Sequence, residues 1–124
     1  MELNTLKDLF ESNKEASLFG RYISYDHIAA LVKKHGQHFK IKAIGTSVLN
    51  LPIYVLGFGN GPKKIFMWSQ MHGNESTTTK AVFDLCNVFF SSEDKSIKYI
   101  LDSCTIAIIP MLNPDGANAY TRLN

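Results

Sequence analysis

The 124-residue sequence contains no uninterrupted apolar run of the roughly 18 residues that crossing a bilayer requires. Its first residues, 1–4, have neither the basic start nor the apolar centre of a secretory signal, so we expect a cytoplasmic protein. Excess charge is also missing, because 13 Lys and Arg are set against 11 Asp and Glu. This balance excludes the strongly basic proteins that bind nucleic acid or membrane surfaces, and we expect neither partner.

Cysteine and histidine are scarce as well. The two cysteines, Cys86 and Cys104, lie in apolar segments, which predicts reduced thiols in the core rather than a disulfide or a metal pair. His35 and His38 lie on either side of Gly36 in a basic stretch, where Gly36 ends a helix. We therefore predict that both are surface histidines and not metal ligands.

The hydrophobic content of 45% is typical of one globular domain with a core. Apolar residues at helical spacing predict helices over about 3–12, 25–35 and 76–90, and a short one that ends near residue 101. Apolar and β-branched runs predict strands over about 39–44, 53–58, 63–70 and 104–111. Trp68 lies inside the third of these strands, so we expect it in the core.

The segments 63–70, 76–90 and 104–111 form a strand–helix–strand unit, which predicts a parallel crossover between the two strands. Both strands are apolar on both faces, as in a sheet that helices cover on each side. The fold class expected is therefore α/β, a three-layer α/β/α arrangement with a mixed, mostly parallel sheet. Polar residues that follow the two strands should meet at one rim of the sheet, where ligands bind in such folds.

The first polar segment at that rim is His72-Gly73-Asn74-Glu75. An imidazole and a carboxylate three residues apart can converge on one cation, and zinc accepts both kinds of donor. Gly73 permits a tight turn between them. The alternative is that His72 is a polar loop residue and that Glu75 is an acid stabilised by the dipole of the helix that follows.

The second polar segment is Asn113-Pro114-Asp115-Gly116, and Arg122 follows it. Taken alone this is a turn sequence, so we expect it to shape the rim under the metal. A guanidinium stays charged at any relevant pH and suits the stabilisation of an oxyanion. Arg122 is therefore a candidate catalytic residue, with an ordinary surface arginine as the alternative, and Tyr120 is expected to be a packing residue.

Over about residues 22–124, these motifs in this order resemble the zinc metallocarboxypeptidase family, peptidase family M14. The resemblance implies a zinc-dependent exopeptidase-like fold, with His72 and Glu75 as Zn²⁺ ligands and Arg122 polarising the scissile carbonyl. The implied reaction is hydrolysis of a C-terminal peptide bond by a zinc-activated water. The implied partner is a peptide or peptide-like substrate with a free C-terminal carboxylate.

The family's third zinc ligand is a histidine well downstream, and its general base is a glutamate further on, yet no histidine follows His72. We therefore expect residues 1–124 to be the N-terminal part of one catalytic domain, incomplete at its C-terminal side and inactive alone. The residues that would set side-chain preference lie outside it.

Two other functions remain open. One is a zinc amidohydrolase that acts on N-acyl amino acids, which shares a His-x-x-Glu motif; the other is a non-catalytic scaffold or binding domain. Because the strand at 104–111 would lack a neighbour, we also expect a homo-oligomer that forms through exposed sheet edges or apolar faces.

Overall fold

The computed structural model of the chain describes residues 3–123. The elements in chain order are α1 (Leu3–Asn13), α2 (Tyr25–His35), β1 (Lys40–Thr46), β2 (Pro52–Gly59), β3 (Lys63–Trp68), α3 (Thr77–Ser91), α4 (Lys95–Ser103), β4 (Cys104–Ile109) and α5 (Pro114–Ala119). Every helix and strand that the sequence predicts is present. The short helix α5 is additional, because it begins where the sequence predicts only a turn.

The four described strands form one mixed sheet in the order β1-β2-β4-β3. The pairs β1–β2 and β2–β4 are antiparallel, whereas β3 and β4 are parallel, as the predicted crossover requires. The expected α/β class with a mixed sheet is confirmed. The parallel pair is the one that matters for the site, because both of its strands end at the same edge.

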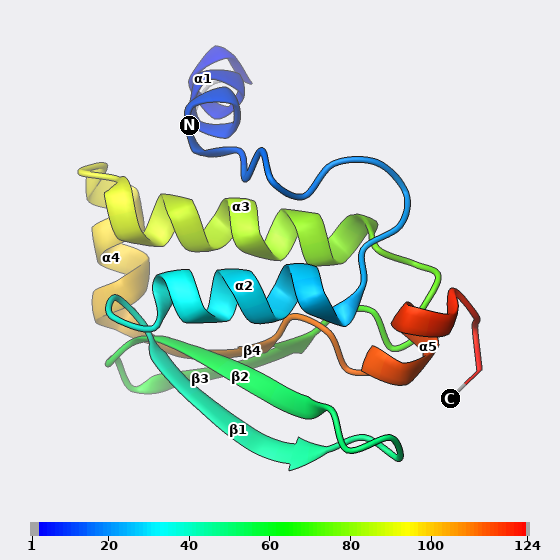
Figure 1. Ribbon diagram of the computed structural model, residues 1–124. Helices are drawn as coiled ribbons and strands as arrows, with labels where there is room; N and C mark the ends of the chain where they lie inside the picture. The colour runs from blue at the N-terminus through cyan, green and yellow to red at the C-terminus, as the bar shows by residue number, and fades with distance from the viewer. Residues whose placement is uncertain (1–2, 124) are drawn as a thin grey trace.

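Helices α2 and α3 lie side by side over one face of the sheet, and α1 lies beyond α3 (Figure 1). The core fills the space between this helical layer and the sheet. Ile28 and Phe83 contribute to it from the helices, and Leu56, Ile106 and Ile108 from the strands, all at most 3% exposed. Burial of each such side chain stabilises the fold by roughly 1.5–3 kcal/mol.

β3 differs from the buried strand that the sequence predicts. It lies at an edge of the described sheet, with Phe66 59% exposed and Trp68 50% exposed, so the prediction of a core Trp68 is wrong. Because side chains alternate along a strand, these two rings point away from α2 and α3, and no described helix covers that face (Figure 1). Residues 3–123 therefore form two layers. The strand that was expected to lack a neighbour, β4, is paired with β2 on one side and β3 on the other, so that expectation is wrong. Association through an exposed sheet edge or an apolar face stays a prediction.

His35 is also placed differently from the prediction, because it is only 5% exposed. It follows Ile28 by two helical turns and so falls on the face of α2 that packs into the core with Leu31 and Val32. Its ring lies 4.0 Å from the Glu15 carboxylate and close to the Phe39 ring. His38, by contrast, is exposed as predicted and packs on a phenylalanine ring.

Cys86 and Cys104 are free and buried, as predicted. Burial raises the pKa of the Cys86 thiol to about 12, so this group is an inert part of the core. None of the helices in residues 3–123 has both the length and the apolar character that a membrane span needs.

Candidate metal centre

The site forms where β3 and β4 end side by side, because the chain after each strand continues their hydrogen bonding. Ser69 N donates to Ile109 O over 2.8 Å, and Leu112 N donates to Ser69 O over 3.0 Å. The segment after β3 carries His72 and Glu75, and the segment after β4 leads into α5 and Arg122. The sheet thus brings together two motifs that lie far apart in the sequence, as the parallel crossover predicts.

The two segments also touch directly, through Gly73 and Gly116. A Cβ atom on Gly73 would lie 1.9 Å from the carbonyl carbon of Gly116 and 2.2 Å from the nitrogen of Ala117. Only a residue without a side chain can approach another backbone so closely. The sequence predicts only a tight turn at Gly73, whereas in the structure the glycine is also needed for this contact between the two motifs.

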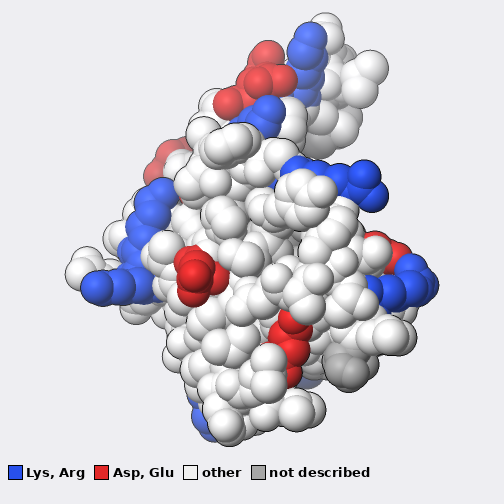
Figure 2. All heavy atoms as spheres, turned by 45° about the vertical axis from the view of Figure 1, so that its right-hand side comes forward, with Lys and Arg blue, Asp and Glu red and all other residues white. Residues whose placement is uncertain are grey.

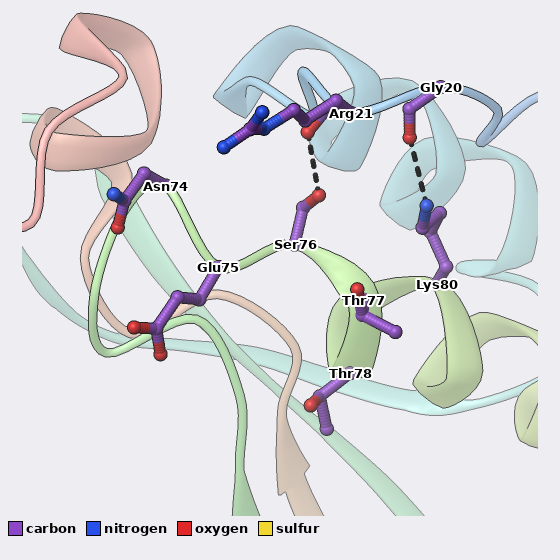
Figure 3. A pocket seen from close by; sticks show the side chains of 8 residues that line it. All are labelled: Gly20, Arg21, Asn74, Glu75, Ser76, Thr77, Thr78 and Lys80. Atoms are coloured by element: carbon purple, nitrogen blue, oxygen red, sulfur yellow. Dashed lines mark hydrogen bonds between the residues drawn. The ribbon is translucent and has the colours of Figure 1, made fainter.

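The three predicted site residues meet at the Glu75 carboxylate. His72 Nδ1 lies 3.1 Å from Glu75 Oε2, and Arg122 Nη1 donates a hydrogen bond to Glu75 Oε1. The side chains of Glu75 and Arg122 are more than half exposed, and that of His72 is 31% exposed. Figure 3 shows that the Glu75 side chain points away from the segment at Gly20 and Arg21.

The two partners of the Glu75 carboxylate favour its ionised form. The hydrogen bond with His72 and, next to it, the hydrogen bond and positive charge of Arg122 lower the pKa of Glu75 from its ordinary value of 4.5. Glu75 is therefore ionised at neutral pH, which is the form that can bind a cation.

His72 and Glu75 fit two positions of a zinc site. Their donor atoms are one nitrogen and one carboxylate oxygen, a combination that zinc accepts. Nδ1 and Oε2 lie 3.1 Å apart, so the two groups are close enough for one cation to contact both. Within residues 3–123, no third histidine, cysteine, aspartate or glutamate side chain lies near enough to join them.

An open hollow of about 420 Å³ lies beside the pair. Its lining combines apolar and polar side chains: Met71, His72, Leu112, Asn113, Arg122 and Leu123. Figure 2 brings this end of the molecule forward, and on the face that it shows the Lys and Arg side chains are separated by uncharged surface. A ligand in the hollow would contact His72 and Arg122 together with apolar side chains.

The Asn113-Pro114-Asp115-Gly116 segment has a structural role, as expected, but it opens helix α5 instead of forming a bare turn. Asn113 is the N-cap, since its Oδ1 accepts a hydrogen bond from Gly116 N over 2.8 Å. The Asp115 carboxylate accepts hydrogen bonds from Ser47 Oγ and Leu49 N, which tie the β1–β2 loop to the rim.

Tyr120 packs as predicted, with its ring 4.3 Å from that of Tyr22. A segment before α2 also lies against the loop of His72 and Glu75, a contact that no pattern in the sequence predicts. Ser76 Oγ donates to Arg21 O, and Lys80 Nζ donates to Gly20 O, both over 2.8 Å (Figure 3). These bonds hold the start of α3 against residues that precede it by more than fifty positions.

Gln70 was missed altogether. It is 4% exposed, and its side-chain amide donates hydrogen bonds to the backbone carbonyls of Ile23, before α2, and Gly73, in the loop after β3. The only sequence signal was the pair Ser69-Gln70, two polar residues directly after an apolar strand, and one such pair has no distinctive spacing.

The chain is similar in sequence to known peptidases. The family model for zinc carboxypeptidases matches residues 24–123. Carboxypeptidase M of Mus musculus is 31% identical over 120 residues, which are 86% of this chain and 27% of the mouse protein. Gamma-D-glutamyl-L-diamino acid endopeptidase 1 of Lysinibacillus sphaericus is 33% identical over 82 residues, or 60% of this chain and 21% of that protein.

Solved structures show the same fold. The metallo-carboxypeptidase of Burkholderia cenocepacia aligns with a TM-score of 0.74 at 23% identity, over 81% of this chain and 29% of that one. Carboxypeptidase A of Helicoverpa armigera aligns with a TM-score of 0.64 at 17% identity, over 99% of this chain and 36% of that one. The chain thus spans between a fifth and about a third of the length of these relatives. With a family model that matches most of its length, the chain belongs to the zinc carboxypeptidase family.

Proposed function

We propose that this chain contributes part of the active site of a zinc metallocarboxypeptidase, which hydrolyses the C-terminal peptide bond of a peptide or peptide-like substrate. The observation that carries the proposal is the convergence of His72 and Arg122 on the Glu75 carboxylate at the rim of the sheet. Family membership supports the zinc-dependent hydrolase chemistry.

In this proposal His72 would carry its ring proton on Nε2, so that Nδ1 and the Glu75 carboxylate, which share a hydrogen bond in the structure, could hold the metal together. Zinc, when bound, polarises a substrate carbonyl and lowers the pKa of a water molecule that it binds towards roughly 7. Glu75 is then a ligand and not the general base. Its lowered pKa keeps it ionised for this role under neutral conditions.

Arg122 is proposed to donate hydrogen bonds to the substrate carbonyl oxygen as negative charge develops there. In the structure its guanidinium is paired with Glu75 Oε1 and its side chain is 59% exposed, so it has room to move. When Glu75 neutralises a cation instead, the pull of Glu75 on Arg122 falls. Arg122 could then turn towards the hollow that it lines with His72.

The test is zinc binding by the chain after metal has been stripped and reloaded, measured by calorimetry. Two side-chain ligands should hold zinc weakly, and His72→Ala should abolish specific binding. His38→Ala, which removes an exposed imidazole elsewhere, is the control and should leave binding unchanged. Undiminished binding by the His72→Ala chain would refute the assignment of the metal site.

A further inference from the structure

We propose that Gln70 is a positioning residue for the metal centre: its buried amide holds the loop of His72 and Glu75 in the orientation in which the two donors converge. This inference rests on the proposed function and adds a residue to it. It is carried by the hydrogen bonds and the backbone conformation of Gln70.

The backbone of Gln70 turns the chain away from β3. Its φ is 46°, in the left-handed region that residues other than glycine seldom adopt. This conformation ends the strand and directs Met71 and His72 over the rim of the sheet. A non-glycine residue keeps such a conformation only where its surroundings hold it there.

The hydrogen bonds of the Gln70 side-chain amide hold its backbone in this conformation. Nε2 donates to Ile23 O over 3.0 Å and to Gly73 O over 2.8 Å, so both of its protons are used. Oε1 lies 2.7 Å from the hydroxyl of Thr79 on helix α3. Since Gln70 is 4% exposed, water cannot replace a bond that is lost, and an unsatisfied group there costs roughly 1–3 kcal/mol.

Thr79 anchors the amide to the sheet. It is fully buried, and its one hydroxyl proton is shared between Gln70 Oε1 and Pro110 O, which lies 2.9 Å from Oγ1, while Ser69 Oγ lies 3.0 Å away. Pro110 directly follows β4, and Ser69 directly follows β3. Thr79 thus fixes the orientation of the Gln70 side chain relative to the ends of both parallel strands and to the start of α3.

These bonds place Gln70 between the two halves of the site. Gly73 O, which it binds, belongs to the residue after His72, and Glu75 follows two residues later. The backbone carbonyl of Gln70 accepts a hydrogen bond over 3.1 Å from Asn113 N, at the start of the segment that carries Arg122. Loss of the amide should therefore disturb first the loop that carries His72 and Glu75. It should then disturb the segment that carries Arg122, through the contact between Gln70 and Asn113.

The experiment is a zinc titration of the 15N-labelled chain, followed by amide NMR shifts, for the native sequence and for Gln70→Leu. We expect the zinc dissociation constant to rise about tenfold in Gln70→Leu, as is typical when a partner that orients a metal ligand is removed. Ile28→Val removes a methylene group from the core beneath α2, away from the loop, and is the control for lost stability alone. It should bind zinc like the native chain, and a folded Gln70→Leu chain that binds zinc within twofold of it would overturn the inference.

The same spectra provide a readout without metal. In Gln70→Leu the amide resonances of Asn74 and Glu75 should move, whereas in Ile28→Val they should stay in place; unmoved resonances in Gln70→Leu would also overturn the inference. If Gln70→Leu does not fold, Thr79→Val removes the anchoring hydroxyl at constant shape and decides by the same two criteria. The variant His72→Ala, measured in parallel, separates the two proposals. If zinc binds equally well without His72, the proposed metal site is refuted. The amide shifts measured without metal still test the proposed role of Gln70.

Discussion

Replacement of Gly73 by alanine should force apart the two segments that form the site. The new Cβ would lie 1.9 Å from Gly116 C and 2.2 Å from Ala117 N, whereas carbon atoms in contact normally stay about 3.5–4.0 Å apart. The obstruction is backbone, which cannot rotate away as a side chain can, so one segment must shift by well over 1 Å. Overpacking of this kind costs typically 1–3 kcal/mol, and we expect the upper half of that range, about 2–3 kcal/mol.

Urea unfolding, followed by circular dichroism, measures this loss directly. When the same signal is followed during heating, the midpoint of thermal unfolding should fall by roughly 8–12 °C, at about 4 °C for each kcal/mol in a domain of this size. The matched control is Gly45→Ala in β1, where an added Cβ meets nothing within 4 Å; its stability should change by less than about 0.5 kcal/mol. Equal effects of the two substitutions would refute the close approach of Gly73 to Gly116.

Acidification should destabilise the chain partly through His35: burial, followed by the charge of Lys34, lowers its folded-state pKa below 6.5, although Glu15 opposes this. The unfolded chain then binds the proton first, so the free energy of unfolding falls as the pH drops through about 6.5. Urea unfolding at about pH 7 and pH 5 should show a smaller drop in this free energy for His35→Gln than for the native chain. An equal drop in the two chains would contradict the assignment. Asn113→Ala removes the N-cap of α5 and should lower the free energy of unfolding by about 1 kcal/mol. Asn113→Asp keeps the acceptor for Gly116 N, so its free energy of unfolding should fall by less. A larger loss of stability in Asn113→Asp than in Asn113→Ala would argue against capping. Cys86 and Cys104 should not react with a thiol reagent in the native chain and should both react in urea, and rapid labelling without denaturant would show that the core opens there.

The order of the elements and the place of the site could be predicted from the sequence because both depend on patterns that repeat along the chain. The helical spacing around Ile28 and Leu31 and the two apolar runs of β3 and β4 are such patterns. The parallel crossover then requires that the segments after β3 and β4, with residues 72–75 and 113–116, approach one another, whatever the residues between them.

What could not be predicted depends on which elements become neighbours. The composition of β3 is that of a buried strand, but the exposure of Trp68 follows from the absence of a described helix on its side of the sheet. The basic residues around His35 indicated a surface position, yet its phase on α2 relative to Ile28 decides its burial. Gln70 has no pattern at all, since its role rests on single hydrogen bonds to Ile23 and Thr79.

The strand order has a consequence for folding. β4 is the last of the described strands, and it lies between β2 and β3, which precede it and do not pair with each other. During synthesis from the N-terminus, β1 and β2 can close as a local hairpin, but β3 and its loop have no sheet to join until residues 104–109 arrive. Contacts between distant segments form late because their loop-closure entropy must be overcome first. The loop of His72 and Glu75 is therefore expected to be among the last parts of the described chain to become ordered, which leaves the β3 edge open to chaperones or to other chains in the meantime.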